Sequence, residues 1–119
     1  MEPYKDHPGL SPEINTRIRE SELAGGVWWK DVEIGMRALV RTKNTSYTLE
    51  QREEGTYISG HALYCPKPVL ARIHGSTWGG SMIKIGWIGV GMKLEFSTAN
   101  HPQDITTSTV QDVLLEPIR

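Results

Sequence analysis

A glycine-rich stretch, residues 75–91, is the feature that most constrains how this chain can fold. It holds six of the twelve glycines and two of the four tryptophans in the 119-residue sequence. Glycine loses more backbone freedom on folding than any other residue, so this density is typical of backbone that turns at positive φ or that another group approaches closely. We therefore expect either a sharp corner of the fold or a docking point for a ligand in this stretch.

The rest of the chain from residue 35 onward consists of short segments rich in β-branched and aromatic residues, separated by turn residues. This pattern predicts strands at residues 36–42, 46–50, 56–60, 69–74, 82–85, 92–96, 105–109 and 110–115. The last segment also fits a helix that opens with a capping box, and we choose a strand because of the β-rich context. Six to eight short strands predict an all-β fold, a small closed or partly open antiparallel β-barrel, with a two-sheet sandwich as the alternative.

The N-terminal quarter of the chain has a different character. Residues 1–10 are rich in proline, glycine and charge and are expected to form a flexible lead-in. Ser11 is followed by proline, which is typical of a helix start, and the apolar spacing beyond it predicts one short helix over residues 12–23. We therefore divide the chain into a lead-in, a helical arm (residues 11–26) and a single β-barrel domain (residues 27–119).

Charge is unevenly distributed, although the net charge is only −1. Residues 55–94 contain no acid, but they contain four bases and two histidines. Either these bases point in several directions or the segment forms a face that attracts anions. A nucleic-acid polymer is an unlikely partner because the whole chain is slightly negative and its aromatic residues are not interleaved with a basic stripe.

The sequence indicates a soluble, cytoplasmic protein with no membrane partner. It contains no apolar run long enough to span a bilayer, and its N-terminus lacks the apolar region of a secretory signal. Cys65 is the single cysteine, so an intrachain disulfide is impossible, which agrees with a reducing compartment.

Motifs for catalysis are missing from the glycine-rich stretch. Ser76 and Ser81 flank glycines, but the pattern lacks the final glycine of a nucleophile elbow, and neither a P-loop nor an ordered dinucleotide fingerprint occurs. No carboxylate lies in the stretch to act as an acid or base. We therefore expect no enzyme and no cofactor, unless His61 or His74 is brought to the stretch together with a carboxylate from elsewhere.

A metal site is not expected either. The possible ligands His61, Cys65, His74 and His101 show none of the close spacings that identify zinc sites. We interpret the histidines as solvated or hydrogen-bonded side chains and Cys65 as a small buried residue.

Glycine amides can nevertheless form an anion-binding nest without a helix. We therefore predict a binding module for an anionic ligand such as a nucleotide, with arginine or lysine on the phosphate and an aromatic ring stacked on the base. The residues predicted to form this site are Arg37, Arg41, Arg72, His74, Ser76, Trp78, Ser81 and Lys84.

Two short motifs carry a resemblance to a known family. Arg37 and Arg41 have the form R-x-x-x-R, and residues 74–79 match D/N-x-S-x-x-G in the serine and glycine, with His74 in the first position. The chain thereby resembles PilZ domains, small bacterial β-barrels that bind cyclic di-GMP, which implies arginines that grip guanine and phosphate. It also resembles small uncharacterised bacterial proteins, for which no function can be carried over.

The alternative function is a structural or protein-interaction module that forms homo-oligomers without a small ligand. Trp28 and Trp29 are adjacent, so in an extended chain they point in opposite directions and one of them is expected to face away from the core. In this hypothesis these tryptophans and Trp78 pack in a subunit interface, where tryptophan is enriched.

Overall fold

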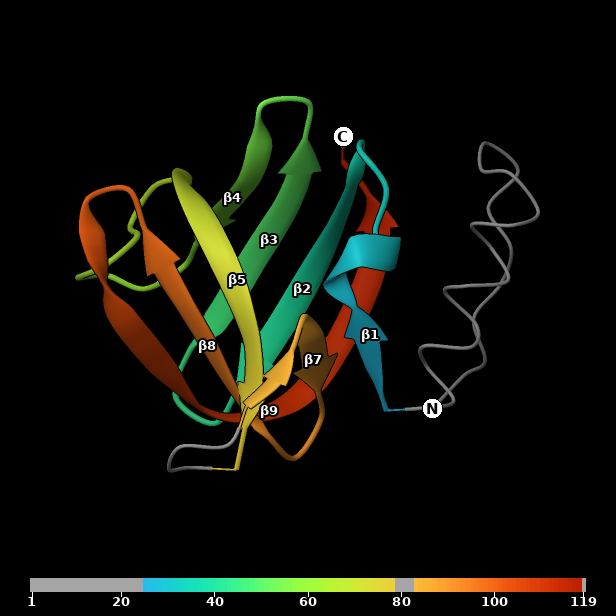
Figure 1. Cartoon of the computed structure of the whole chain (residues 1–119), viewed down its shortest axis with the longest axis vertical. Helices are drawn as coiled ribbons and strands as arrows, with labels where there is room; N and C mark the ends of the chain where they lie inside the picture. The colour runs from blue at the N-terminus through green and yellow to red at the C-terminus, as the bar shows by residue number, and fades with distance from the viewer. Residues whose placement is uncertain (1–24, 79–82, 119) are drawn as a thin grey trace.

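The computed structural model of the chain describes residues 25–78 and 83–118 (Figure 1). In this part the fold is all-β, with one single-turn 3-10 helix, η1 (Trp29–Asp31), after the first strand. The strands are β1 (Gly26–Trp28), β2 (Met36–Thr42), β3 (Ser46–Arg52), β4 (Gly55–Ser59), β5 (Val69–Thr77), β6 (Ile83–Ile85), β7 (Trp87–Gly89), β8 (Lys93–Thr98) and β9 (His101–Pro117).

The predicted all-β class is confirmed, and several predicted strands lie at or near their predicted bounds. Strand β2 has the predicted bounds, whereas the two strands predicted at 105–109 and 110–115 are one continuous strand, β9. The helical alternative for the last segment is therefore wrong. The helix predicted over residues 12–23 lies outside the described residues. Among the residues that are described, no helix is long and apolar enough to cross a membrane.

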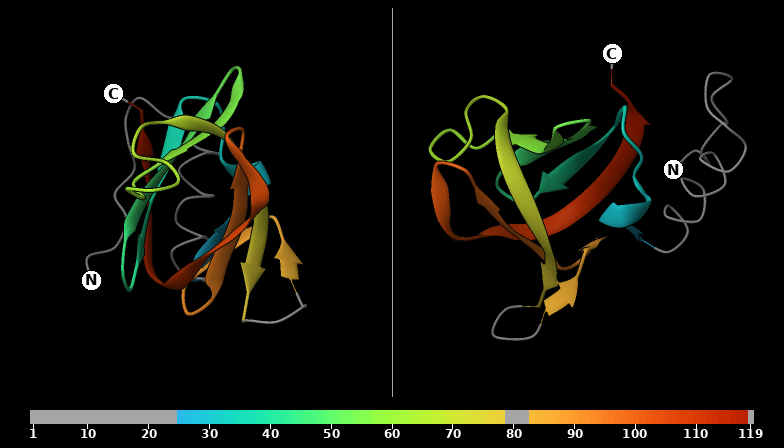
Figure 2. Two further views of the ribbon diagram at one scale, coloured as in Figure 1. Left: turned by 90° about the vertical axis from the view of Figure 1, so that its left-hand side faces the viewer. Right: turned by 45° about the horizontal axis from the view of Figure 1, so that its top comes forward.

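Six antiparallel strands form a sheet that closes on itself. Its strand order is β4-β3-β2-β9-β8-β5-β6, and β4 also pairs with β5, so the first six strands form a ring. Figure 1 shows β4, β3 and β2 side by side, and Figure 2 shows the ring from two further sides. β4 and β6 pair with the same edge of β5 at different points along its length. β4 pairs with Val69–Ala71, and β6 pairs with the residues from Gly75 to Thr77. β1 and β7 form a separate two-stranded sheet.

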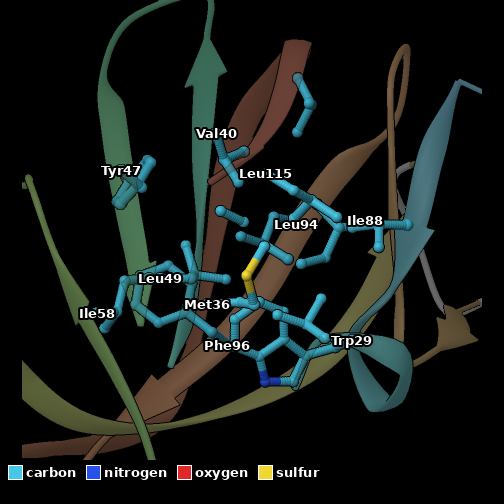
Figure 3. Packing of buried hydrophobic residues seen from close by; sticks show 14 of the residues in the cluster. Trp29, Met36, Val40, Tyr47, Leu49, Ile58, Ile88, Leu94, Phe96 and Leu115 are labelled. Atoms are coloured by element: carbon cyan, nitrogen blue, oxygen red, sulfur yellow. The ribbon is translucent and has the colours of Figure 1, made fainter. Parts of the chain in front are cut away.

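The interior of the ring is filled by alternate residues of its strands, as the period-2 pattern predicts. Ala38 and Val40 of β2, Leu49 of β3 and Phe96 of β8 are all fully buried. Figure 3 shows how these side chains pack against one another from different strands. Burying an aliphatic or aromatic side chain of this size stabilises the fold by about 1.5–3 kcal/mol, so this cluster holds the ring together.

The tryptophan pair packs as expected, with one ring inside and one outside. Trp29 is buried in the core cluster, and its Nε1 donates a hydrogen bond of 2.8 Å to Thr56 Oγ1. Trp28 is 37% exposed and contacts the ring of Trp87 edge-on at 4.9 Å between centroids. Trp29, in η1 directly after β1, therefore packs in the core, whereas Trp28 at the end of β1 lies partly at the surface.

Within the glycine-rich stretch, Gly75 lies at a point of close backbone approach inside strand β5. The residue has φ +149°, and a Cβ there would lie 2.1 Å from the carbonyl oxygen of Lys84. The register of β5 against β8 also shifts between Ile73 and Gly75. Glycine is needed because β6 crosses close to this point, and the shift leaves His74 partly exposed while Ser76 is buried.

Candidate functional site

The eight residues predicted to bind a ligand are divided among several places. Arg37 and Arg41 lie on β2, and each guanidinium contacts a carboxylate of β9. Arg37 Nε donates to Glu116 Oε1 at 2.6 Å, and Arg41 Nε donates to Asp112 Oδ2 at 2.7 Å. Both cations are thus neutralised within the chain.

The two motifs of the family resemblance lie on different walls of the ring. Counting along the pairings, β2 and β5 are three strands apart in either direction, so Arg37 and Arg41 do not converge with Arg72, His74 and Ser76. Ser81 lies outside the described residues.

Ser76 is fully buried and its hydroxyl is used inside the protein. The Oγ donates a hydrogen bond to the carbonyl oxygen of Trp87 and accepts one of 3.1 Å from the backbone N–H of Gly89. The hydroxyl therefore fixes β7 against β5.

Three predicted residues do come together. Ser76, Trp78 and Lys84 line a cavity of about 260 Å³ with Ile83 and Met92. Trp78 is 73% exposed and forms an open aromatic wall. We call this site the Trp78–Lys84 cavity.

The ammonium group of Lys84 is held over two tryptophan rings. Its Nζ lies 4.4 Å from the ring centroid of Trp87 and 5.0 Å from that of Trp28, which are cation–π distances. In the part of the chain that the structure describes, it has no ion pair with a carboxylate, in keeping with the absence of acids between residues 55 and 94. Within residues 25–78 and 83–118 the positive charge is therefore positioned but not neutralised.

His74 is surrounded by carboxylates that sequence reasoning missed. Its Nδ1 lies 3.2 Å from Glu95 Oε1 and 3.2 Å from Asp104 Oδ1, and its Nε2 lies 3.2 Å from Ser97 Oγ. The alternation of β8 predicts that Glu95 faces outward between Leu94 and Phe96. Nothing in the sequence shows that β8 lies between β5 and β9, so the cluster could not be found from spacing.

A groove of about 390 Å³ lies beside this histidine. Arg72 lines it, and Ser97 joins the groove to the His74 cluster. The other lining residues are Leu70, Ala71, Thr98, Ala99 and Pro102.

The other two histidines in the described residues make ring contacts. His61 and His101 each contact the ring of Tyr64, at 4.7 Å and 4.8 Å between centroids. Cys65 is buried as expected, and burial raises the pKa of its thiol, which disfavours the nucleophilic thiolate. These residues show no arrangement for nucleophilic catalysis.

Comparisons with known proteins add no assignment, because no family model, curated protein or solved structure matches the chain. The function must therefore be inferred from the geometry above.

Proposed function

We propose that the protein is a small β-barrel binding module for a ligand that combines a planar ring with a negative charge, such as a mononucleotide. The observation that carries this proposal is the Trp78–Lys84 cavity, where an exposed indole and a lysine that has no carboxylate partner among the described residues line the same space. Trp78 would stack on the ring, and Lys84 would bind the anionic group.

The size and charge of the cavity limit what it can take. A volume of about 260 Å³ is just below the roughly 300 Å³ at which pockets for small molecules begin. It fits one ring and its charged substituent better than a whole dinucleotide. Stacking of a base on an aromatic side chain contributes about 1–3 kcal/mol, and the cation–π contacts keep the Lys84 charge in place before the ligand arrives.

Isothermal titration calorimetry with a panel of mononucleotides at low salt tests this function. We expect Trp78→Ala and Lys84→Met to weaken binding at least about tenfold, because each removes an attraction worth more than about 1.4 kcal/mol. Arg41→Met is the matched control, since it removes one positive charge that Asp112 already neutralises on another wall. No heat with any nucleotide, or native affinity in Lys84→Met, would show that the proposal is wrong.

One observation favours the alternative, a protein-interaction module. In the described part of the chain β6 pairs with β5 alone, and its Ile85 is 78% exposed. An apolar edge strand is a template for pairing with another chain.

If a second copy pairs there, Ile85→Lys converts the oligomer to a monomer in size-exclusion chromatography with light scattering. A native chain that is monomeric at every concentration rules out this oligomer.

A further inference from the structure

We propose that His74, Glu95 and Asp104 form a binding site for a divalent transition metal, and that zinc is the ion it fits best. The three residues come from the adjacent strands β5, β8 and β9. One nitrogen and two carboxylate oxygens lie within 4.8 Å of one another. Imidazole with carboxylates is a donor set that zinc uses in proteins.

Two of the three distances between the ligand atoms suit a tetrahedral ion. Zinc binds histidine nitrogen at about 2.0–2.1 Å and carboxylate oxygen at about 2.0–2.2 Å. Two ligand atoms of a tetrahedron with these bonds are roughly 3.4 Å apart. His74 Nδ1 lies 3.2 Å from Glu95 Oε1 and 3.2 Å from Asp104 Oδ1, so two edges of the tetrahedron already have nearly the required length.

A cation also resolves an electrostatic mismatch in the cluster. A single proton on Nδ1 points at one acceptor, yet both carboxylates approach this nitrogen at the same distance and repel each other. A divalent ion would bind both oxygens and the nitrogen lone pair together.

Ser97 supports the required form of the histidine. Its Oγ lies 3.2 Å from Nε2 and can accept the Nε2–H bond of the tautomer whose Nδ1 lone pair is free. Metal-binding histidines almost always donate their second ring N–H in this way, and losing such a partner typically weakens metal binding by about 10–100-fold.

The site has room for a further ligand of the metal. Three protein ligands leave the fourth position of a tetrahedral zinc open, as in catalytic zinc sites. Asp104 is 62% exposed at its side chain, so an ion can enter from solvent. The groove lined by Arg72 and Ser97 adjoins the cluster, so a water or a small anion bound to the metal would lie near the Arg72 guanidinium.

The test is a titration of the full, untagged, metal-free chain with zinc chloride in a calorimeter at near-neutral pH. We expect one zinc per chain. His74→Ala, Glu95→Gln and Asp104→Asn should each weaken zinc binding at least about tenfold, and Ser97→Ala by about tenfold. Far-UV circular dichroism of each variant verifies that the fold is kept.

Two control variants separate this site from nonspecific zinc binding. Asp112→Asn removes a carboxylate from the same strand as Asp104, and His61→Ala removes a histidine that contacts Tyr64. Both should bind zinc like the native chain. Cobalt(II) gives a second readout, because the visible absorption of a four-coordinate ion should appear in the native chain and be absent in His74→Ala.

The proposal is overturned if the native chain binds no zinc, or if the three ligand variants bind it as tightly as the native chain. Displacement of zinc by equimolar Mg²⁺ would also contradict it, since Mg²⁺ requires a nearly octahedral set of oxygens that this site does not provide.

Discussion

The hydroxyl of Ser76 joins two stretches of backbone that belong to different sheets. It lies on β5 of the ring, and both of its partners, Trp87 and Gly89, lie on β7 of the two-stranded sheet. Among the described residues every buried side-chain polar atom has a hydrogen-bond partner. The Ser76 hydroxyl is thus one of the contacts that attach β7 to the ring, together with the fully buried Ile88 of β7.

Ser76→Ala should lower the free energy of unfolding by about 2 kcal/mol, because it leaves a buried carbonyl and a buried N–H without partners. Urea denaturation measures the change. Ser46→Ala, at an exposed position of β3, should change it by less than about 0.5 kcal/mol. Equal effects at the two serines would contradict the role of the Ser76 hydroxyl.

Strand β9 is the longest strand in the described part of the chain, with 17 residues, and it pairs with a different neighbour along each half. It pairs with β2 from Val110 to Pro117 and with β8 from His101 to Thr109. Its side chains alternate between core and surface near the end, where Leu115 is buried and Leu114 is 46% exposed. The strand therefore seals the ring with one face and meets solvent with the other.

Leu115→Ala should destabilise the protein by about 2–5 kcal/mol, because it leaves a cavity in the core. Leu114→Ala, at the preceding residue, should lower the free energy of unfolding by less than about 1 kcal/mol. Urea denaturation of both variants measures the difference. Similar losses of free energy of unfolding in the two variants would contradict the alternation of buried and exposed side chains in β9.

The strands were predictable where their pattern is local. Residues 36–42 alternate cleanly and end in a turn, and β2 has these bounds. The sequence predicted two strands, 105–109 and 110–115, but the strand is continuous, and Ser108 Oγ donates a hydrogen bond of 2.8 Å to Thr42 Oγ1 across the sheet. Such partners lie far away in the sequence, so no window of residues reveals them.

The candidate site was predictable only in part for the same reason. Trp78 and Lys84 are close in sequence and meet at one cavity. Arg37 was predicted to bind a ligand, but its guanidinium pairs with the carboxylate of Glu116, which is 79 residues away in the sequence. The acids around His74 come from two other strands and were missed entirely.

At the scale of the whole molecule, the closed ring buries ionisable side chains such as Tyr47 away from solvent. Tyr47 is buried inside it and packs edge-on against Phe96 at 5.7 Å between centroids. Burial, with smaller contributions from the charges of Cys65 and Tyr64, raises the pKa of Tyr47 to about 12. The folded chain therefore holds this proton more tightly than the unfolded chain, whose tyrosine pKa is about 10.

The stability of the protein should fall in alkali for this reason. Above about pH 10 the unfolded chain binds fewer protons than the folded chain, so the free energy of unfolding decreases until about pH 12. At about pH 11 the loss from Tyr47 is roughly 1.4 kcal/mol. Urea denaturation at about pH 9 and about pH 11 should show this loss in the native chain but not in Tyr47→Phe. An equal loss in both proteins would exclude Tyr47 as its source.

The pairing of β2 with β9 also sets the order in which the chain can fold during synthesis. Arg37 leaves the ribosome 79 residues before Glu116, its neighbour across the sheet. Until then one edge of β2 has no partner, although β3 can already pair with the other edge. Contacts of such long sequence separation slow folding, and an open strand edge invites pairing with other chains. The nascent protein is therefore most prone to aggregate in the interval before β9 emerges.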